Sequence, residues 1–334
     1  MNIYEQQTKN KRLTAIIMVV FIAFFLFLGL GFDYFYASFK PQAEPVFTEN
    51  YDGYYETEMK NQPIPYATII AFLVGCFMVG NSAFNGAQMV LKSTMARRAS
   101  SLNPKEKQFL NIVSEMSIAS GLPKPGAYII PDYDLNAFAT GFSPEKSYIA
   151  VTEGLIAELN REEMQGVVAH EMSHIRNYDI RLMTIISALM GAIALLSDFA
   201  SRRMFRGRSS RRSSGKGGGA IMIAIFVIWI IAIIIAPFLS RILAMAVSRK
   251  REYLADASAA ELTRNPKGLI SALEKIRNAV SHTKTINNGV AHMCITDPRG
   301  SLIEEKLGFT ADLLASHPPM EKRILALKVM AYGQ

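Results

Sequence analysis

Long uncharged, apolar runs alternate with segments of mixed polarity along this chain of 334 residues. Residues 13–32 and 64–91 carry no charged side chain, and a helix formed by either run is about long enough to cross the hydrocarbon core of a membrane. Two further apolar runs cover residues 182–197 and 220–240. The pattern predicts a multi-pass membrane protein whose amino-terminal part holds two transmembrane helices.

The segments between these runs have the mixed polarity of a globular domain. Residues 104–120 should form a helix, because Pro104 stands at the start and Gly121 follows the end. Asn160 can cap another helix, with Glu163 completing a capping box. Short apolar runs bounded by Pro, Asp and Gly predict three strands, at residues 127–130, 135–140 and 147–151.

Helical patterns also cover residues 249–263 and 267–280, and a last helix should start at Pro318 and Pro319. We therefore predict an α+β fold, mainly α, in which membrane helices carry a globular domain with a small β-sheet. Its expected parts are an anchor with an acidic external loop (1–91), a first half of the globular domain (92–181), an apolar helical pair joined by a basic Gly/Ser loop (182–240) and a second half (241–334).

The distribution of charge predicts an orientation. The net charge is +8, and the basic residues cluster beside the apolar runs, whereas the loop 33–63 is acidic. Because Lys and Arg collect on cytoplasmic flanks, we expect the amino terminus and the residues from 92 onward inside and the acidic loop outside. The Arg-rich loop belongs to no recognisable nucleic-acid-binding module, so the charge does not indicate a nucleic-acid binder.

The segment 198–219 is rich in Arg, Ser and Gly, and we expect it to be disordered. It leaves the topology of the flanking apolar pair open. If residues 182–197 and 220–240 both cross the membrane, the basic loop lies outside, against the inside bias. If neither crosses, they form a hairpin buried in protein or in the interface. We favour crossing, because the second run is so apolar.

The candidate chemistry is concentrated at residues 170–174, which read His-Glu-Met-Ser-His. Histidines four apart share one helix face, so both imidazoles can reach one zinc ion while the glutamate holds the attacking water. Chance gives about 0.004 such matches in a chain of this composition. Cys76 and Cys294 lie far apart, so neither a disulfide framework nor a cysteine zinc site is expected.

A catalytic zinc usually has three protein ligands and an open fourth position, so a third ligand must come from another segment. The best candidate is Glu252, because Asp256 one turn later can accept the remaining ring N–H of a histidine ligand. The alternative for this pair is a solvated, charged helix face. Asn177 and Asp179, just past the motif, are further candidates for supporting contacts.

Together these motifs resemble the HtpX-type membrane zinc metalloproteases, gluzincins related to the endoproteases that process prenylated CAAX proteins. The resemblance covers nearly the whole chain, and its matching segments follow the order of the family: 136–141, 150–155, 170–179, 252–256 and 317–323. It implies a zinc endopeptidase with one Zn²⁺ per chain. The resemblance makes Glu171 the general base, and it assigns the zinc ligands as His170, His174 and Glu252.

The resemblance implies further roles. His317 and Arg323 correspond to a pair near the developing oxyanion, where a donor stabilises charge that appears only in the transition state. Four residues correspond to the edge strand that takes an extended substrate through backbone hydrogen bonds, namely Asn136, Ala137, Phe138 and Ala139. A plain helix start and an ordinary strand are the alternatives. His282 and His292 match no ligand position, and we interpret them as surface or structural residues.

The resemblance also implies a location and a task. The protein would lie in the plasma (inner) membrane with its catalytic domain on the cytoplasmic side, and its partners would be the lipid bilayer and unfolded or damaged membrane proteins that it degrades. Two alternatives stay open: a processing protease for a few membrane substrates, and a zinc-binding membrane scaffold without hydrolysis. Glu171 argues against the scaffold, and the lack of path-forming polar residues in the apolar runs argues against a transporter.

Overall fold

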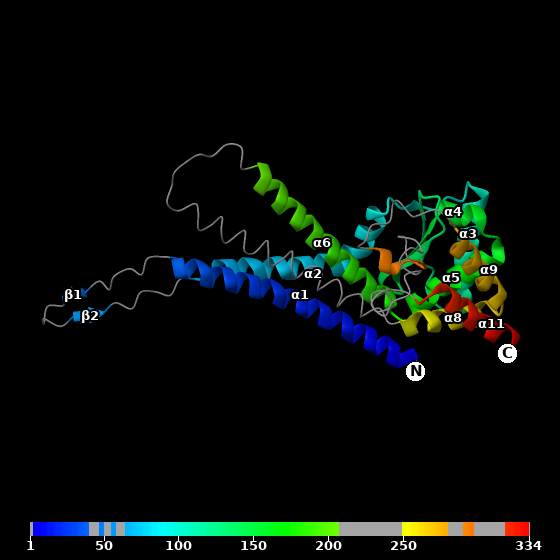
Figure 1. Cartoon of the computed structure of the whole chain (residues 1–334), viewed down its shortest axis with the longest axis horizontal. Helices are drawn as coiled ribbons and strands as arrows, with labels where there is room; N and C mark the ends of the chain where they lie inside the picture. Colours follow the sequence, from blue (N-terminus) through cyan, green and yellow to red (C-terminus); the bar gives the residue numbers. More distant parts are fainter. Residues whose placement is uncertain are drawn as a thin grey trace. The chain divides into compact units, whose positions relative to one another are not determined.

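The structure is a computed structural model and describes residues 3–39, 47–49, 55–57, 64–206, 249–279, 290–296 and 318–333. These residues are mainly helical, with a four-stranded and a two-stranded sheet, which confirms the predicted α+β, mainly α, fold (Figure 1). The chain has two compact units. The first comprises Met1–Ile17, Gly80–Ala194 and Pro237–Gln334, and the second comprises Met18–Val79 and Leu195–Ala236.

The four-stranded sheet belongs to the first unit and has the strand order β3-β4-β6-β5. β4 (Gly126–Ile130) and β6 (Lys146–Thr152) run parallel to each other. β5 (Ala137–Ser143) is antiparallel to β6 and forms one edge, while the short β3 (Arg97–Arg98) is antiparallel to β4. The three predicted strands are confirmed, with ends that differ by a few residues.

α5 (Arg161–Arg176) is the central helix of the first unit. It packs against β5 and three further helices: α3 (Pro104–Ser120), α8 (Arg249–Thr263) and α9 (Pro266–Asn278). Buried apolar residues fix it in the core, among them Val167, Val168, Met172 and Ile175. At Gly166 the backbones approach closely, since a Cβ there would lie 2.8 Å from the backbone nitrogen of Leu269. The position of α5 is therefore fixed from several sides.

The predicted helix ends are also present. Asn103 caps α3, which ends before Gly121 in the left-handed conformation, with φ of 66°, as glycine allows without strain. The helices expected from residues 249, 267 and 318 are α8, α9 and α11 (Met320–Tyr332). Short helical segments complete the unit: α4 (Glu153–Glu158) and the 3₁₀ turn η2 (Ala291–Met293).

The second unit contains most of α1 (Ile3–Phe39) and the first half of α2 (Tyr66–Ser93), joined by a segment that includes the strands β1 (Phe47–Glu49) and β2 (Tyr55–Thr57). The two helices pack closely, because a Cβ on Gly29 would lie 2.5 Å from Thr68 Cα. Both are long and apolar enough to cross a membrane. Large apolar side chains point outward, with Phe27 63% and Phe77 73% exposed, which points to a membrane protein.

α6 (Asp179–Arg206) contains the apolar run 182–197 and continues to Arg206. The expectation of disorder from residue 198 is therefore wrong for the start of the basic segment, because an established helix extends at little cost. The rest of that segment and the run 220–240 lie outside the described residues. Whether the apolar pair crosses the membrane stays a prediction.

The start of α5 is held by the predicted capping box. Asn160 Oδ1 accepts a hydrogen bond from the N–H of Glu163. The carboxylate of Glu163 is buried and accepts from three groups: the N–H of Asn160 at 2.8 Å, Oγ of Ser271 at 2.6 Å and Nζ of Lys275 at 2.9 Å. One side chain thus caps α5 and ties it to α9.

Replacing Glu163 by glutamine should destabilise the protein at neutral pH, by about 1–2 kcal/mol for these charge-assisted bonds. Burial alone raises the pKa of Glu163, but its hydrogen bonds together lower it. The stabilisation is therefore present above the unfolded pKa of about 4.3 and is lost as the pH falls through the lower folded value. Thermal unfolding at several pH values checks this, with Glu162→Gln, an exposed neighbour, as control. A difference that persists unchanged at pH 3 would contradict it.

Candidate active site

The predicted metal ligands come together at one point. His170 and His174 lie one turn apart on α5, and their Nε2 atoms are 3.2 Å apart. Glu252 comes from the first turn of α8, and its two carboxylate oxygens lie 3.7 Å from the Nε2 atoms of His170 and His174, respectively. Two ligands of a tetrahedral zinc ion, each about 2.0–2.1 Å from it, are about 3.3 Å apart. The three groups therefore need only small adjustments to hold such an ion.

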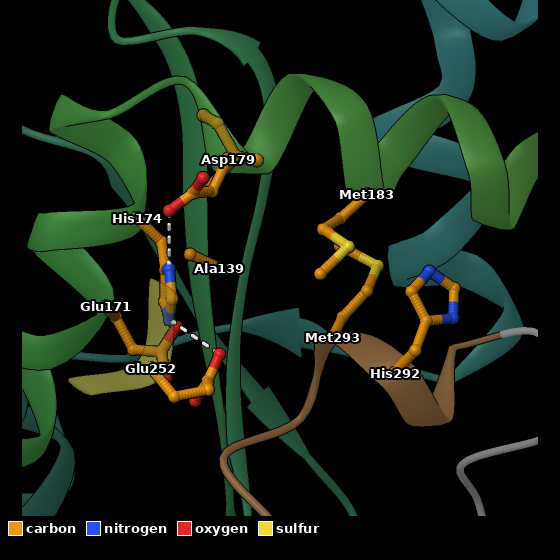
Figure 2. Close-up of a pocket in the computed structure, with 9 residues that line it drawn as sticks. Ala139, Glu171, His174, Asp179, Met183, Glu252, His292 and Met293 are labelled. Atoms are coloured by element: carbon orange, nitrogen blue, oxygen red, sulfur yellow. Dashed lines mark hydrogen bonds and ion pairs between the residues drawn. The ribbon is translucent and has the colours of Figure 1, made fainter. Parts of the chain in front are cut away.

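Two carboxylates orient the histidine rings. Asp256 Oδ1 lies 2.9 Å from Nδ1 of His170, and Asp179 Oδ2 lies 3.0 Å from Nδ1 of His174 (the second contact is dashed in Figure 2). A carboxylate at Nδ1 favours the tautomer with its proton on that atom. The lone pair of each Nε2 is then available to a metal, so both acids lie where supporting residues are expected.

Glu171 lies beside these ligands and is 1% exposed. Its Oε2 atom has no hydrogen-bond partner within the part of the chain that the structure describes. The side chain lines a pocket together with residues of β5, α6, α8 and η2 (Figure 2), among them Ala139, Met183, Glu252 and Met293. Burial raises the pKa of Glu171, and the two ligand histidines oppose that effect. The arrangement suits a base that takes a proton from a water molecule.

Arg323 is fully buried and binds Asp256. Its Nε and one terminal nitrogen donate to the two carboxylate oxygens at 2.8 and 2.7 Å, and the other terminal nitrogen donates to the carbonyl of Ile295 at 2.9 Å. The same nitrogen lies 3.7 Å from Glu252. The structure thus places Arg323 as a partner of the acids that support the site. His317 lies outside the described residues, so its place near an oxyanion stays a prediction.

The charges around the histidines fit a divalent cation. Four carboxylates and two guanidinium groups are buried here: Glu171, Asp179, Glu252 and Asp256 against Arg251 and Arg323. Among the described residues, two negative charges are thus unbalanced when the histidines are neutral. Burial opposes protonation of His174, but the hydrogen bond with Asp179 and the nearby carboxylates raise the pKa of His174 to about 9. In the absence of a metal, a proton on this ring offsets part of the excess.

The strand segment expected to bind substrate is partly paired with the chain itself. The carbonyl of Ala137 accepts a hydrogen bond from the backbone of residues 294–296, at 2.9 Å, and Phe138 forms a β-bridge with the same segment. The side chain of Asn136 donates to it at 3.2 Å. Ala139 lines the pocket beside the catalytic candidates. The binding of substrate by these four residues stays a prediction.

Sequence reasoning missed several residues of the site. Arg251 is buried, with a terminal nitrogen 3.5 Å from Asp179 Oδ1, and its only sequence signal is its place next to Glu252. His292, interpreted as surface or structural, lines the pocket, and its Nε2 lies 3.3 Å from Oγ of Ser187. No spacing pattern links η2 to the motif, because the two segments meet only through the tertiary fold.

The predicted supporting residue Asn177 ends α5 as its C-cap. It is buried, and its backbone N–H donates to the carbonyls of Ile175 and Ser173. Its contribution is therefore to the turn between α5 and α6, which positions Asp179 at the start of α6. It is not among the residues that line the pocket.

Comparison with known proteins extends these observations to a family. Residues 103–331 match the sequence model of peptidase family M48. The chain is 34% identical over 328 residues to "Protease HtpX homolog" of Streptococcus uberis, and 35% identical over 328 residues to the protein of that name from Streptococcus gordonii; each match covers 98% of this chain and 100% of the relative. It is also similar to the crystal structure of S. mikatae Ste24p, with a TM-score of 0.45 and 18% identity, over 78% of this chain and 57% of that one.

The family match includes every site residue that lies on α5, α8 and α11, and the relatives match along their full length. The resemblance seen in the sequence is thus confirmed, and the enzyme class is that of a metalloprotease. The chain therefore belongs to peptidase family M48, among the HtpX-type proteases.

Proposed function

We propose that this protein is a membrane-bound, zinc-dependent endopeptidase that degrades misfolded or damaged membrane proteins. The observation that carries the proposal is the convergence of three ligand groups, from His170, His174 and Glu252, whose donor atoms all lie within 4.8 Å of one another. The carboxylate of Glu171 lies beside them with an oxygen available for a water molecule. Imidazole nitrogens and a carboxylate form the ligand set of many catalytic zinc sites.

A zinc ion held by these residues would polarise the scissile carbonyl and lower the pKa of a water molecule. Glu171 Oε2 accepts a proton from the attacking water, whose oxygen bonds to the carbonyl carbon. The same oxygen of Glu171 then returns that proton to the amine nitrogen as the C–N bond breaks. Asp179 and Asp256 hold the ligand imidazoles in the tautomer that this arrangement requires.

The walls of the pocket support a broad choice of substrate. Met183 and Met293 line it beside Glu171 (Figure 2), and flexible thioether side chains adapt to apolar groups of different shape. At Ala139 the edge of β5 adjoins the pocket, where backbone hydrogen bonds bind an extended chain without reading its side chains. Both features suit unfolded chains of varied sequence.

The amino-terminal helices support a location at a membrane. α1 and α2 each contain a span that is long and apolar enough to cross it. The Lys/Arg bias of their flanks supports a catalytic domain on the cytoplasmic side of the plasma (inner) membrane. Anchoring at the bilayer would keep the peptidase close to membrane proteins.

The proposal is tested with the purified full-length protein, loaded with zinc in liposomes, on two forms of one membrane protein: the native form and a destabilised single-residue variant. We expect cleavage at several positions of the destabilised form and little cleavage of the native form. A chelator or Glu171→Gln should remove both. Cleavage of both forms at the same one or two sites would identify a processing protease, and no cleavage by the zinc-loaded protein would contradict the proposal.

A further inference from the structure

We propose that Asn10 is a positioning residue of the metal site, which makes the amino-terminal end of α1 a part of the peptidase. The inference rests on the zinc site proposed above. Residues Met1–Ile17 belong to the same compact unit as the site, although they lie far from it in the sequence. The side chain of Asn10 is 3% exposed.

Asn10 connects to a metal ligand through one intervening residue. Its Nδ2 donates to Oδ1 of Asp179 at 2.6 Å and to the carbonyl of Asn177 at 2.9 Å, which uses both N–H groups of the amide. The other oxygen of Asp179 lies 3.0 Å from Nδ1 of His174. A displacement of Asn10 would therefore move the carboxylate that orients this histidine.

The neighbours of Asn10 hold the same turn between α5 and α6. The side chain of Gln7 donates to the carbonyl of Arg176 at 2.7 Å, and the ammonium group of Lys11 lies 4.1 Å from the centre of the Tyr178 ring. Tyr178 has a φ of 57°, a left-handed conformation that is costly for a large side chain. Contacts from α1 thus stabilise a turn that its own sequence does not favour.

The chemistry of Asn10 suits this position. Asp179 is a buried carboxylate, and the guanidinium of Arg251 lies farther from its Oδ1, at 3.5 Å. An amide is a neutral donor, so it fixes the carboxylate without cancelling the negative charge that His174 faces. If Asn10 had a purely structural role, its replacement would lower stability equally with and without a metal and would leave zinc affinity unchanged. A positioning residue instead changes zinc affinity, which can be measured.

The test compares the full-length protein in detergent with Asn10→Ala, Asn10→Leu and the matched control Thr14→Ala. Thr14 lies one turn further along α1, is 2% exposed and donates a buried hydrogen bond to the carbonyl of Asn10. The zinc dissociation constant, from competition with a chelator, should rise about tenfold in Asn10→Ala, at the lower end of the effects of outer ligand partners. Thr14→Ala should lower the metal-free thermal midpoint and leave the zinc dissociation constant unchanged.

Asn10→Leu keeps the side-chain size, removes both N–H donors and adds no charge, so zinc binding should weaken by about as much as in Asn10→Ala. This variant provides the test if Asn10→Ala does not fold. In an Asp179→Asn background, Asn10→Ala should change the dissociation constant by less than about twofold, because the link is already broken. Unchanged zinc binding in both Asn10 variants, or a full tenfold effect in the Asp179→Asn background, would overturn the inference. A wild-type protein that binds no zinc would overturn the proposed metal site and this inference with it.

Discussion

Replacing Glu171 by glutamine should abolish most peptide hydrolysis while zinc stays bound. Glutamine keeps the size of the side chain, but its amide cannot take a proton from water and return it to the leaving amine. General acid–base groups contribute about 10²–10⁴-fold to rate, so kcat should fall by that factor. The zinc dissociation constant should change little, because the proposed ligand atoms belong to His170, His174 and Glu252.

The measurement is the rate of casein cleavage at equal zinc occupancy. Glu162→Gln makes the same chemical change at an exposed position of the same helix, and this control should keep the wild-type rate. If Glu171→Gln cleaves casein as fast as wild type, the base lies elsewhere. If the variant has lost its zinc, Glu171 contributes to zinc binding and does not act as a base alone.

Replacing Arg323 by methionine should destabilise the metal-free protein by about 3–5 kcal/mol, the usual cost of removing one partner of a buried ion pair. The guanidinium is fully buried, and its bidentate contact holds Asp256, which lies at Nδ1 of His170. Burial alone raises the pKa of Asp256, but the charge and hydrogen bonds of Arg323, together with His170, lower it to about 2. Zinc binding should weaken as well, because the carboxylate that orients His170 loses its fixed position.

Thermal unfolding without metal and a chelator competition with zinc measure the two effects. Lys322→Met, at the exposed neighbouring position, should change neither. The double variant Asp256→Asn, Arg323→Met should recover part of the stability, because it no longer buries an unpaired carboxylate. The family resemblance implies a role of Arg323 near the oxyanion. If that were its only role, Arg323→Met would lose turnover while its stability and zinc affinity stay at wild-type values.

Features with a local signal could be predicted from the sequence. Asn160 and Glu163 form the expected capping box, and Gly121 ends α3 in the left-handed conformation. The two histidines of the motif share a helix face because of their spacing alone. Each of these patterns depends on residues within one or two turns, so it holds whatever the rest of the chain does.

The contacts between distant segments that complete the site could not be predicted from a local sequence pattern. Asn10 and Asp179 are 169 positions apart, and Arg323 and Asp256 are 67 apart, so no periodicity connects them. The pairing of residues 294–296 with β5 is likewise decided by packing, since edge strands accept any extended segment that reaches them. The sequence therefore predicts the ligands and the two acids that orient them, Asp179 and Asp256, while the contacts that hold those acids, from Asn10 and Arg323, emerge only from the fold.

The zinc content of the purified full-length protein is the sharpest test of the proposed metal site. We expect one zinc ion per chain in the wild type and a loss of that ion in His170→Ala and in Glu252→Ala, while thermal unfolding shows that each variant keeps its fold. Zinc bound equally by the wild type and both variants would contradict the assignment of the ligands. A folded wild-type protein that binds no zinc would contradict the metal site itself.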